Sequence, residues 1–165
     1  MAEELKDWFD RGFYKELAGA LADEHLPLDR RAFVRDACRS LEDLSLLERL
    51  ARTASLCRKH LPDDYPKALG IVSAVAPRYD GTFKALFAPE FVARYGRQDR
   101  RRSLQALRHL THFGSAEFAI RHFMVDDFDD TLAVMTRWAR DDNHQVRRLA
   151  SEGCRPRLLW LFQLK

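Results

Sequence analysis

The sequence predicts an all-α protein. Apolar side chains recur at helical spacing along most of the chain, and helix-capping residues precede many of these runs. No segment alternates apolar and polar residues beside turn residues in the manner of a β-strand. We therefore expect nine or ten helices joined by short loops. Two architectures remain open at this point, an α-solenoid of stacked helix pairs and an irregular helical bundle.

The first half of the chain contains four expected helices. Gly12 marks a break in the first of them, and Asp29 can cap the second. Pro62 ends the third helix, and Asp63 or Asp64 begins the fourth. The expected ranges are 3–24, 30–41, 44–60 and 63 to about 75.

The second half is expected to begin after a loop over residues 76–82. Pro89 should lie at a helix boundary, Ser115 can cap a helix, and Asp129 or Asp130 can start the next one. The expected ranges are 83–95, 99–112, 115–124, 129–139, 144–153 and 156–163. The last four helices form two pairs of about 30 residues each, which is a length typical of solenoid repeats.

The stretch from Trp138 to Trp160 has the clearest pattern. Asp142 and Asn143 can cap a helix that begins near His144. One face of this helix carries residues spaced i, i+3, i+4 and i+7, namely Val146, Leu149, Ala150 and Gly153. Arg147, Arg148 and Ser151 point away from that face. A repeat that presents arginines and a carboxylate to solvent can bind a polyanion.

The same stretch predicts an ion pair and a helix end. Arg148 and Glu152 are i, i+4 neighbours, so their side chains can meet on the surface. Gly153 should stop the helix, and Pro156 suits the first turn of a following helix. Trp160 then lies eight residues after Glu152.

The composition is typical of a cytoplasmic globular protein. The chain has 165 residues, of which 46% are apolar and 32% charged, and it contains neither a long apolar run nor a signal-peptide pattern. The three cysteines are widely spaced and fit no metal motif. His109 and His112 have helical spacing, but no third ligand accompanies them. We therefore expect no metal, no cofactor and no membrane partner.

Basic residues are concentrated in the second half of the chain. Residues 1–93 contain 14 Lys/Arg and 16 Asp/Glu, whereas residues 94–165 contain 14 and 9. This imbalance favours a surface that faces a polyanion in the second half. A solubilising surface is the alternative.

Five stretches carry a resemblance to a known family. They are LKDWFDRGFYKELAGALA, LPDDYPKAL, FAPEFVARYG, SAEFAIRHF and RRLASEGCRPRLLW. The chain resembles the AlkC/AlkD-like DNA alkylation-repair proteins, most closely the AlkC branch, and the likeness covers nearly all of it. Members of this family are HEAT-repeat DNA glycosylases, so the resemblance favours the HEAT-like solenoid over the irregular bundle. Family members usually continue past the tryptophan that ends the last of these stretches, Trp160, into further repeats, so we expect a C-terminally truncated member.

The resemblance implies a DNA repair function in the nucleoid. The implied activity is hydrolysis of the N-glycosidic bond of cationic alkylated bases, such as 3-methyladenine, in duplex DNA and without base flipping. Two alternatives stay open. One is a truncated, catalytically inactive DNA-binding protein, and the other is a helical protein–protein adaptor, which is a common use of α-solenoids.

Two carboxylates and one tryptophan are the catalytic candidates. A carboxylate can stabilise the positive charge that develops on the sugar as the glycosidic bond breaks. Glu152 is expected to be the main carboxylate, oriented by Arg148, and Glu117 forms an i, i+4 pair with Arg121 one repeat earlier. Trp160 matches the family tryptophan that contacts the lesion nucleotide. Trp138 is assigned to the core.

The expected DNA-binding residues are all arginines. They are Arg121, Arg147, Arg148, Arg155 and Arg157, which can hold phosphates. Arg100 to Arg102 can extend this set or cap and solvate a helix. We expect one all-helical domain over residues 1–165, with N-terminal helices in 1–97 and the HEAT-like repeats in 98–165. Its last helix has an apolar face that predicts self-association.

Overall fold

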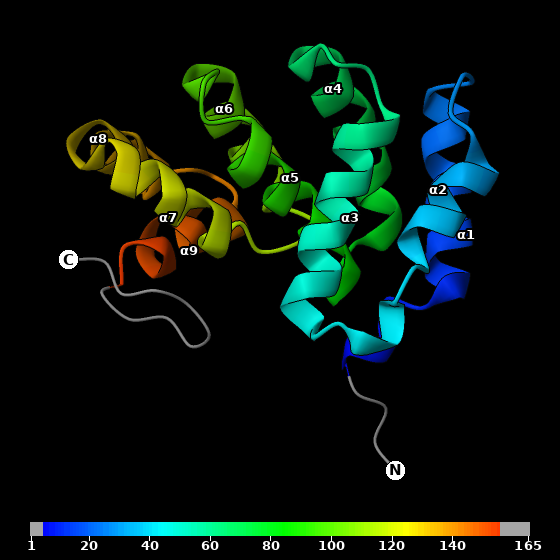
Figure 1. Cartoon of the computed structure of the whole chain (residues 1–165). Helices are drawn as coiled ribbons and strands as arrows, with labels where there is room; N and C mark the ends of the chain where they lie inside the picture. Colours follow the sequence, from blue (N-terminus) through cyan, green and yellow to red (C-terminus); the bar gives the residue numbers. More distant parts are fainter. Residues whose placement is uncertain (1–4, 156–165) are drawn as a thin grey trace.

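The structure is a computed structural model that describes residues 5–155. Every regular element within these residues is a helix (Figure 1). The α-helices are α1 (Arg11–Glu24), α2 (Arg30–Ala37), α3 (Leu46–His60), α4 (Tyr65–Val75), α5 (Phe87–Tyr95), α6 (Arg100–Leu110), α7 (Glu117–Asp126), α8 (Phe128–Trp138) and α9 (His144–Gly153). Four short 3-10 helices accompany them, η1 (Leu5–Trp8), η2 (Leu41–Asp43), η3 (Ala76–Tyr79) and η4 (Phe83–Leu86). The all-α prediction is confirmed.

Side-chain caps fix most helix starts. The Asp29 carboxylate accepts hydrogen bonds from the backbone N–H groups of Arg31 and Ala32, at 2.9 and 3.0 Å. Asp64 caps α4 in the same way, and Ser45 with Glu48 forms a capping box at the start of α3. Because these signals are local, they could be predicted from the sequence.

Several expected boundaries are wrong. The first break lies before Gly12, because the Asp10 carboxylate accepts the Phe13 N–H at 2.7 Å and starts α1 there. Pro89, in contrast, does lie at a helix boundary, in the first turn of α5, where its missing N–H breaks no helical hydrogen bond. Asp127, and not Asp129 or Asp130, caps α8.

Two further ranges differ from expectation. The second helix ends at Ala37 instead of residue 41, and a separate short helix, η2, follows it. The expected loop over residues 76–82 contains the 3-10 helix η3.

The helices stack in chain order from α1 and α2 at one end to α7, α8 and α9 at the other (Figure 1). Alternate helices are direct neighbours, since α3 contacts α5, α5 contacts α7, and α7 contacts α9. The intervening helices α6 and α8 contact the alternate helices on either side of them. This arrangement is an α-solenoid and not an irregular bundle.

The core runs continuously along the stack. It includes Phe9, Phe33, Phe91 and Phe123, none of which is exposed to solvent. Trp138 is 8% exposed, which confirms its assignment to the core. No helix within residues 5–155 is long and apolar enough to span a membrane.

Some predictions fall outside the described residues. These are the final helix over 156–163 with Pro156, the phosphate contact by Arg157, the aromatic role of Trp160, and self-association through the apolar terminal face.

Candidate functional site

Helix α9 forms as its sequence predicts. The Asn143 side chain accepts hydrogen bonds from the backbone N–H groups of Gln145 and Val146, at 2.8 and 3.3 Å. The predicted inward face is buried in full, and it comprises Val146, Leu149, Ala150 and Gly153. The helix ends at Gly153, where an added Cβ would lie 2.7 Å from Ile120 Cγ2 and 2.8 Å from Met135 Cε. A glycine at this position therefore allows α9 to approach α7 and α8 closely.

Arg148 pairs with a carboxylate on the neighbouring repeat. Its Nη2 lies 3.2 Å from Oε1 of Glu117, the first residue of α7. The expected pair within α9, Arg148 with Glu152, is therefore wrong. An arginine placed N-terminal to a glutamate at i, i+4 has the less favourable orientation, and α7 offers a better-placed partner. The Glu117 side chain is 13% exposed and that of Arg148 is 58% exposed.

Glu152 has a different cation. Its Oε1 lies 2.8 Å from Nη2 of Arg155, which is three residues later. The Glu152 side chain is 21% exposed and that of Arg155 is 61% exposed. Both candidate carboxylates are thus largely covered, and each is paired with an arginine that extends into solvent.

Arg121 has a structural role that its sequence position does not reveal. Its side chain is fully buried, and Nη1 donates hydrogen bonds to the carbonyl oxygens of Gly153 and Arg155, at 3.5 and 2.7 Å. Burial lowers the pKa of this guanidinium. The expected surface pair with Glu117 and the expected contact of Arg121 with phosphate do not fit this geometry. Arg121 instead holds the C-terminal end of α9.

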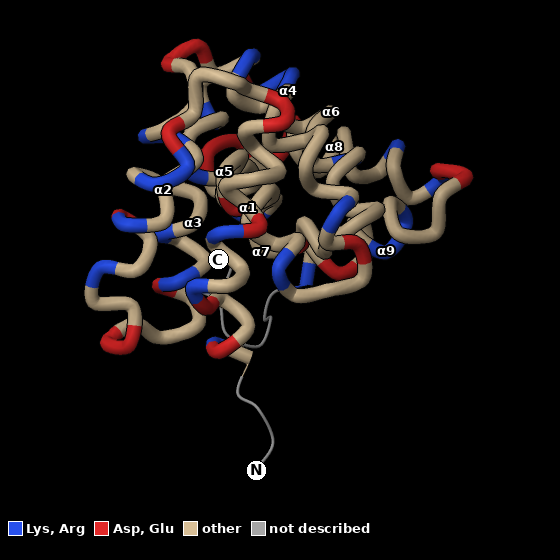
Figure 2. The backbone as a smooth tube through the Cα atoms, turned by 90° about the vertical axis from the view of Figure 1, so that its right-hand side faces the viewer, with Lys and Arg blue, Asp and Glu red and all other residues tan. Residues whose placement is uncertain are grey.

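The remaining basic residues are mostly engaged. Arg147 is exposed, and its Nη1 donates to the carbonyl oxygens of Asp141 and Asp142, both at 2.8 Å. Arg100 donates to Asp130 at 2.9 Å and contacts the start of α8, so it braces two repeats. Arg102 is paired with Asp99 at 2.6 Å. Along the backbone tube in Figure 2, segments coloured for Lys and Arg are interspersed with segments coloured for Asp and Glu.

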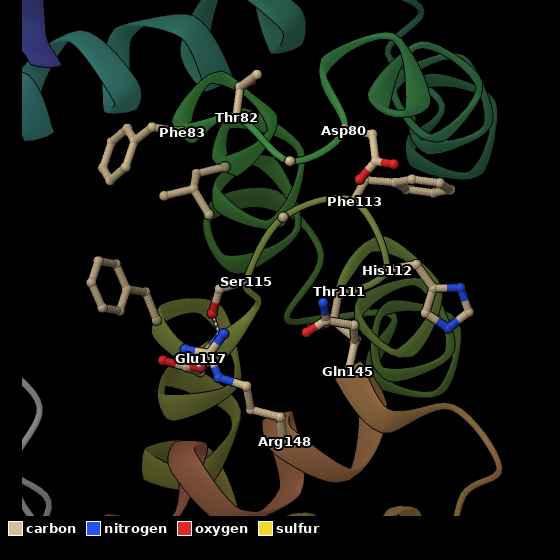
Figure 3. A pocket seen from close by; sticks show the side chains of 14 residues that line it. Asp80, Thr82, Phe83, Thr111, His112, Phe113, Ser115, Glu117, Gln145 and Arg148 are labelled. Carbon is tan, nitrogen blue, oxygen red and sulfur yellow. Dashed lines mark hydrogen bonds and ion pairs between the residues drawn. The ribbon is translucent and has the colours of Figure 1, made fainter.

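The Glu117–Arg148 pair lies in a groove of about 360 Å³ (Figure 3). Two segments enclose this groove, residues 80–86, which include η4, and residues 111–118, which lead into α7, and Gln145 and Arg148 of α9 complete it. The two segments touch closely, because the Gly81 N–H donates to the Phe113 carbonyl at 3.1 Å. A Cβ at Gly114 would lie 2.8 Å from Ala85 Cβ. The sequence patterns did not predict that residues 80–86 line this groove. Gly81 and Gly114, which allow the two segments to approach closely, were the feature of the sequence that could have indicated it.

The groove combines aromatic, polar and charged groups. Phe83, Phe113 and Phe118 provide apolar surface, and the Ser115 hydroxyl accepts the Glu117 N–H at 3.2 Å. The pKa of His112 is lowered by burial first and then by His109 and Arg108. A carboxylate beside a cation and aromatic rings can contact a sugar and stabilise positive charge on it. Within residues 5–155, no group of three or more His, Cys, Asp or Glu side chains could hold a metal ion.

The chain is similar to two known proteins. No family model matches the chain. The chain is 34% identical over 160 residues to the uncharacterized protein YhaZ of Bacillus subtilis, with 95% of this chain and 44% of YhaZ covered. Its fold matches Pseudomonas fluorescens alkylpurine DNA glycosylase AlkC, solved with DNA containing an abasic site analog, with a TM-score of 0.95 and 46% identity. That match covers 99% of this chain and 46% of AlkC, so the chain spans less than half the length of either protein.

Proposed function

We propose that this chain, which is an AlkC-like HEAT-repeat protein, supplies part of a DNA glycosylase. That part is the one that contacts the lesion. Its substrate is a cationic alkylated base, such as 3-methyladenine, in duplex DNA. The observation that carries this proposal is the ion pair between Glu117 and Arg148, which joins two successive repeats at the edge of an aromatic groove. In the second pair, Glu152 lies on the same helix as Arg148, and its partner Arg155 lies two residues after the end of that helix.

The chemistry requires only modest help from the protein. An N3- or N7-alkylated purine carries a positive charge, so it leaves as a neutral base and takes the electron pair of the glycosidic bond. The positive charge moves to the sugar, where a nearby carboxylate stabilises it. Water then forms the new bond to C1′ and gives up a proton, which the carboxylate can accept. Glu152 and Glu117 are the proposed carboxylates. The alkylated base can remain stacked in the DNA double helix until its bond to the sugar breaks.

The arginines are proposed to hold the backbone. Arg148 and Arg155 each extend into solvent from a carboxylate partner, so each can turn to a phosphate when DNA arrives. Arg147 is proposed to contribute beside them from an exposed position. The largely covered carboxylates stay close to the sugars, whereas the cations reach the phosphates.

The direct test is release of 3-methyladenine from methylated duplex DNA by the full chain. Release above the spontaneous rate supports the glycosylase. Tight, strongly salt-dependent duplex binding without release would show a DNA-binding protein that does not catalyse. Binding that is absent even at low salt would contradict both readings and leave the protein–protein adaptor.

A further inference from the structure

We propose that a second groove, between α1 and α2, binds the phosphodiester backbone of duplex DNA. This groove has a volume of about 640 Å³ and lies at the opposite end of the solenoid from α9 (Figure 1). Six of its nine lining residues are cations, and none is an acid. They are Arg11, Lys15, Arg30, Arg31, Arg35 and Arg39, and Ala18, Val34 and Cys38 complete the lining.

The position of this charge is unexpected. Residues 1–93 contain more acidic than basic residues, yet six of their 14 Lys/Arg line one groove. Figure 2 faces this end of the solenoid, where α2 carries the blue of Lys and Arg. The fold therefore separates the charges of this half and gathers cations between its first two helices.

Internal carboxylates do little to neutralise the groove. Among the described residues, no ion pair involves Arg11, Lys15, Arg31 or Arg39. Arg30 lies 3.7 Å from Asp23, at the outer limit of an ion pair. Arg35 lies 3.4 Å from Asp36, but that carboxylate is bonded more closely to Lys59 Nζ at 2.6 Å and to His60 at 3.1 Å.

The helices present like charges at a spacing that is unfavourable without a ligand. Arg11 and Lys15 are i, i+4 neighbours on α1, and Arg31 and Arg35 are i, i+4 neighbours on α2. Like charges at this spacing repel and destabilise a helix. A bound polyanion removes that repulsion and leaves the cations in place.

The chemistry of the groove favours a phosphodiester. Five of the six cations are arginines, whose planar guanidinium groups bind phosphate oxygens in pairs, and no carboxylate among the nine lining residues would repel the backbone. The choice of duplex DNA over other polyanions rests on the proposed function. The groove lies at the other end of the solenoid from the Glu117 pocket, so it holds duplex away from the lesion and adds affinity without reading a base.

The test compares two double variants that remove equal charge. Arg31→Ala/Arg35→Ala acts in the groove, whereas Lys67→Ala/Arg140→Ala removes two exposed cations outside it. Fluorescence anisotropy with an undamaged duplex of about 30 base pairs, over a salt series, gives the slope of log K against log salt. We expect the groove variant to lower affinity and to flatten the slope by about two, and the control to change both much less. Equal slopes for the two variants would overturn the proposal.

Two further measurements distinguish this proposal from binding of a different anion and from the proposed glycosylase activity. Phosphatidylserine vesicles and polyglutamate are offered to the same variants. Loss of vesicle or peptide binding with no loss of DNA binding would also overturn the proposal, because the groove would serve a different anion. Base release at saturating protein should be the same for the groove variant and the wild type, since no groove residue lines the Glu117 pocket. If the wild type releases no base, the slope still decides whether the groove binds DNA.

Discussion

Glu117 on α7 and Arg148 on α9 face each other across successive repeats, with Oε1 and Nη2 3.2 Å apart. The carboxylate is held at the start of its helix and is 13% exposed, whereas the arginine is 58% exposed. A covered carboxylate beside an exposed cation can serve two parts of one nucleotide, the sugar and the phosphate. Other pairs in the chain, such as Arg108 with Asp141, show the same asymmetry, but Glu117 and Arg148 both line the aromatic groove, and this position motivates the first prediction.

Arg148→Ala should weaken DNA binding but leave the fold stable. An ion pair with one exposed partner contributes less than about 1 kcal/mol, so the free energy of unfolding should fall by no more than that. Affinity for every duplex sequence should fall, and the salt slope should flatten by about one. Arg140→Ala is the control, because Arg140 is exposed and lies outside the groove. An unchanged slope would mean that Arg148 serves only Glu117.

Arg121→Leu should be strongly destabilising. The substitution leaves the carbonyl oxygens of Gly153 and Arg155 without their buried donor. Loss of hydrogen bonds from a buried charged group costs about 2–5 kcal/mol. Urea unfolding followed by circular dichroism measures this loss, with Arg140→Ala expected to stay within about 0.5 kcal/mol of the wild type. A mild effect of Arg121→Leu on stability with a large loss of DNA affinity would restore the phosphate contact first expected for Arg121.

The contrast between two similar segments explains why the role of Arg121 could not be predicted. The motifs PEFVAR and AEFAIR lie 27 residues apart, in α5 and α7. In α5 the pair of Glu90 with Arg94 forms at i, i+4, with a distance of 2.5 Å. In α7 the equivalent pair does not form, because Glu117 and Arg121 both interact with α9. Local sequence specifies the helix, but the neighbouring repeat selects the partners of its charged residues.

The same distinction holds for the rest of the chain. Caps such as Asp29 and Asn143, and the inward face of α9, follow from residues within one helical turn, so they were predictable. The groove between residues 80–86 and 111–118 depends on a contact between two segments about 30 residues apart in the sequence, the hydrogen bond from the Gly81 N–H to the Phe113 carbonyl, so it depends on tertiary structure. The basic groove of α1 and α2 also depends on tertiary structure, since the net charge of that half is negative.

Gly153→Ala should destabilise the stack of α7, α8 and α9. The added methyl group would lie 2.7 Å from Ile120 Cγ2 and 2.8 Å from Met135 Cε, and although the end of the Met135 side chain can move, the Ile120 methyl is fixed to its Cβ. Overpacking of this kind costs about 1–3 kcal/mol. Gly70→Ala on α4 is the matched control, because Gly70 is exposed and its Cβ would meet nothing within 4 Å. It should stabilise the protein by up to about 1 kcal/mol in the same urea titration. Equal effects of the two substitutions would show that close approach at Gly153 is not required.

Acid should weaken the contact between α2 and α3. Lys59 first, and then His60, hold the pKa of Asp36 at about 2, against an ordinary value of 3.8. A pKa that is depressed in the folded state contributes stability above the unfolded value, and that contribution is lost as pH falls from about 4 to about 2. Asp36→Asn should therefore reduce the difference between the urea midpoints at about pH 6 and about pH 3. Asp63→Asn, at a fully exposed carboxylate, is the control and should leave the difference between the two midpoints as in the wild type. If Asp36→Asn also leaves it unchanged, the contacts of Asp36 with Lys59 and His60 do not contribute to the acid response.

The last prediction concerns the catalytic carboxylates. Glu152→Gln keeps the size and hydrogen-bonding capacity of the side chain but removes the charge that would stabilise an oxocarbenium ion. If the chain releases base, this change should lower the rate by about 10²-fold, which is the scale of losing one electrostatic stabiliser. DNA affinity should change little, because the proposed phosphate contacts are made by arginines and not by Glu152.

Glu117→Gln provides the comparison that assigns the two roles. Glu117 lines the aromatic groove and is paired with Arg148, whereas Glu152 is paired with Arg155 and does not line the groove. If Glu152 is the main carboxylate, Glu117→Gln should have the smaller effect on rate. A larger effect of Glu117→Gln would transfer the main role to the carboxylate that faces the groove. Glu24→Gln, at an exposed position on α1, should match the wild type. Rates of base release are compared on methylated duplex DNA at saturating protein, so that weaker binding cannot be mistaken for slower chemistry. Equal rates for the wild type and Glu152→Gln would exclude Glu152 from the mechanism.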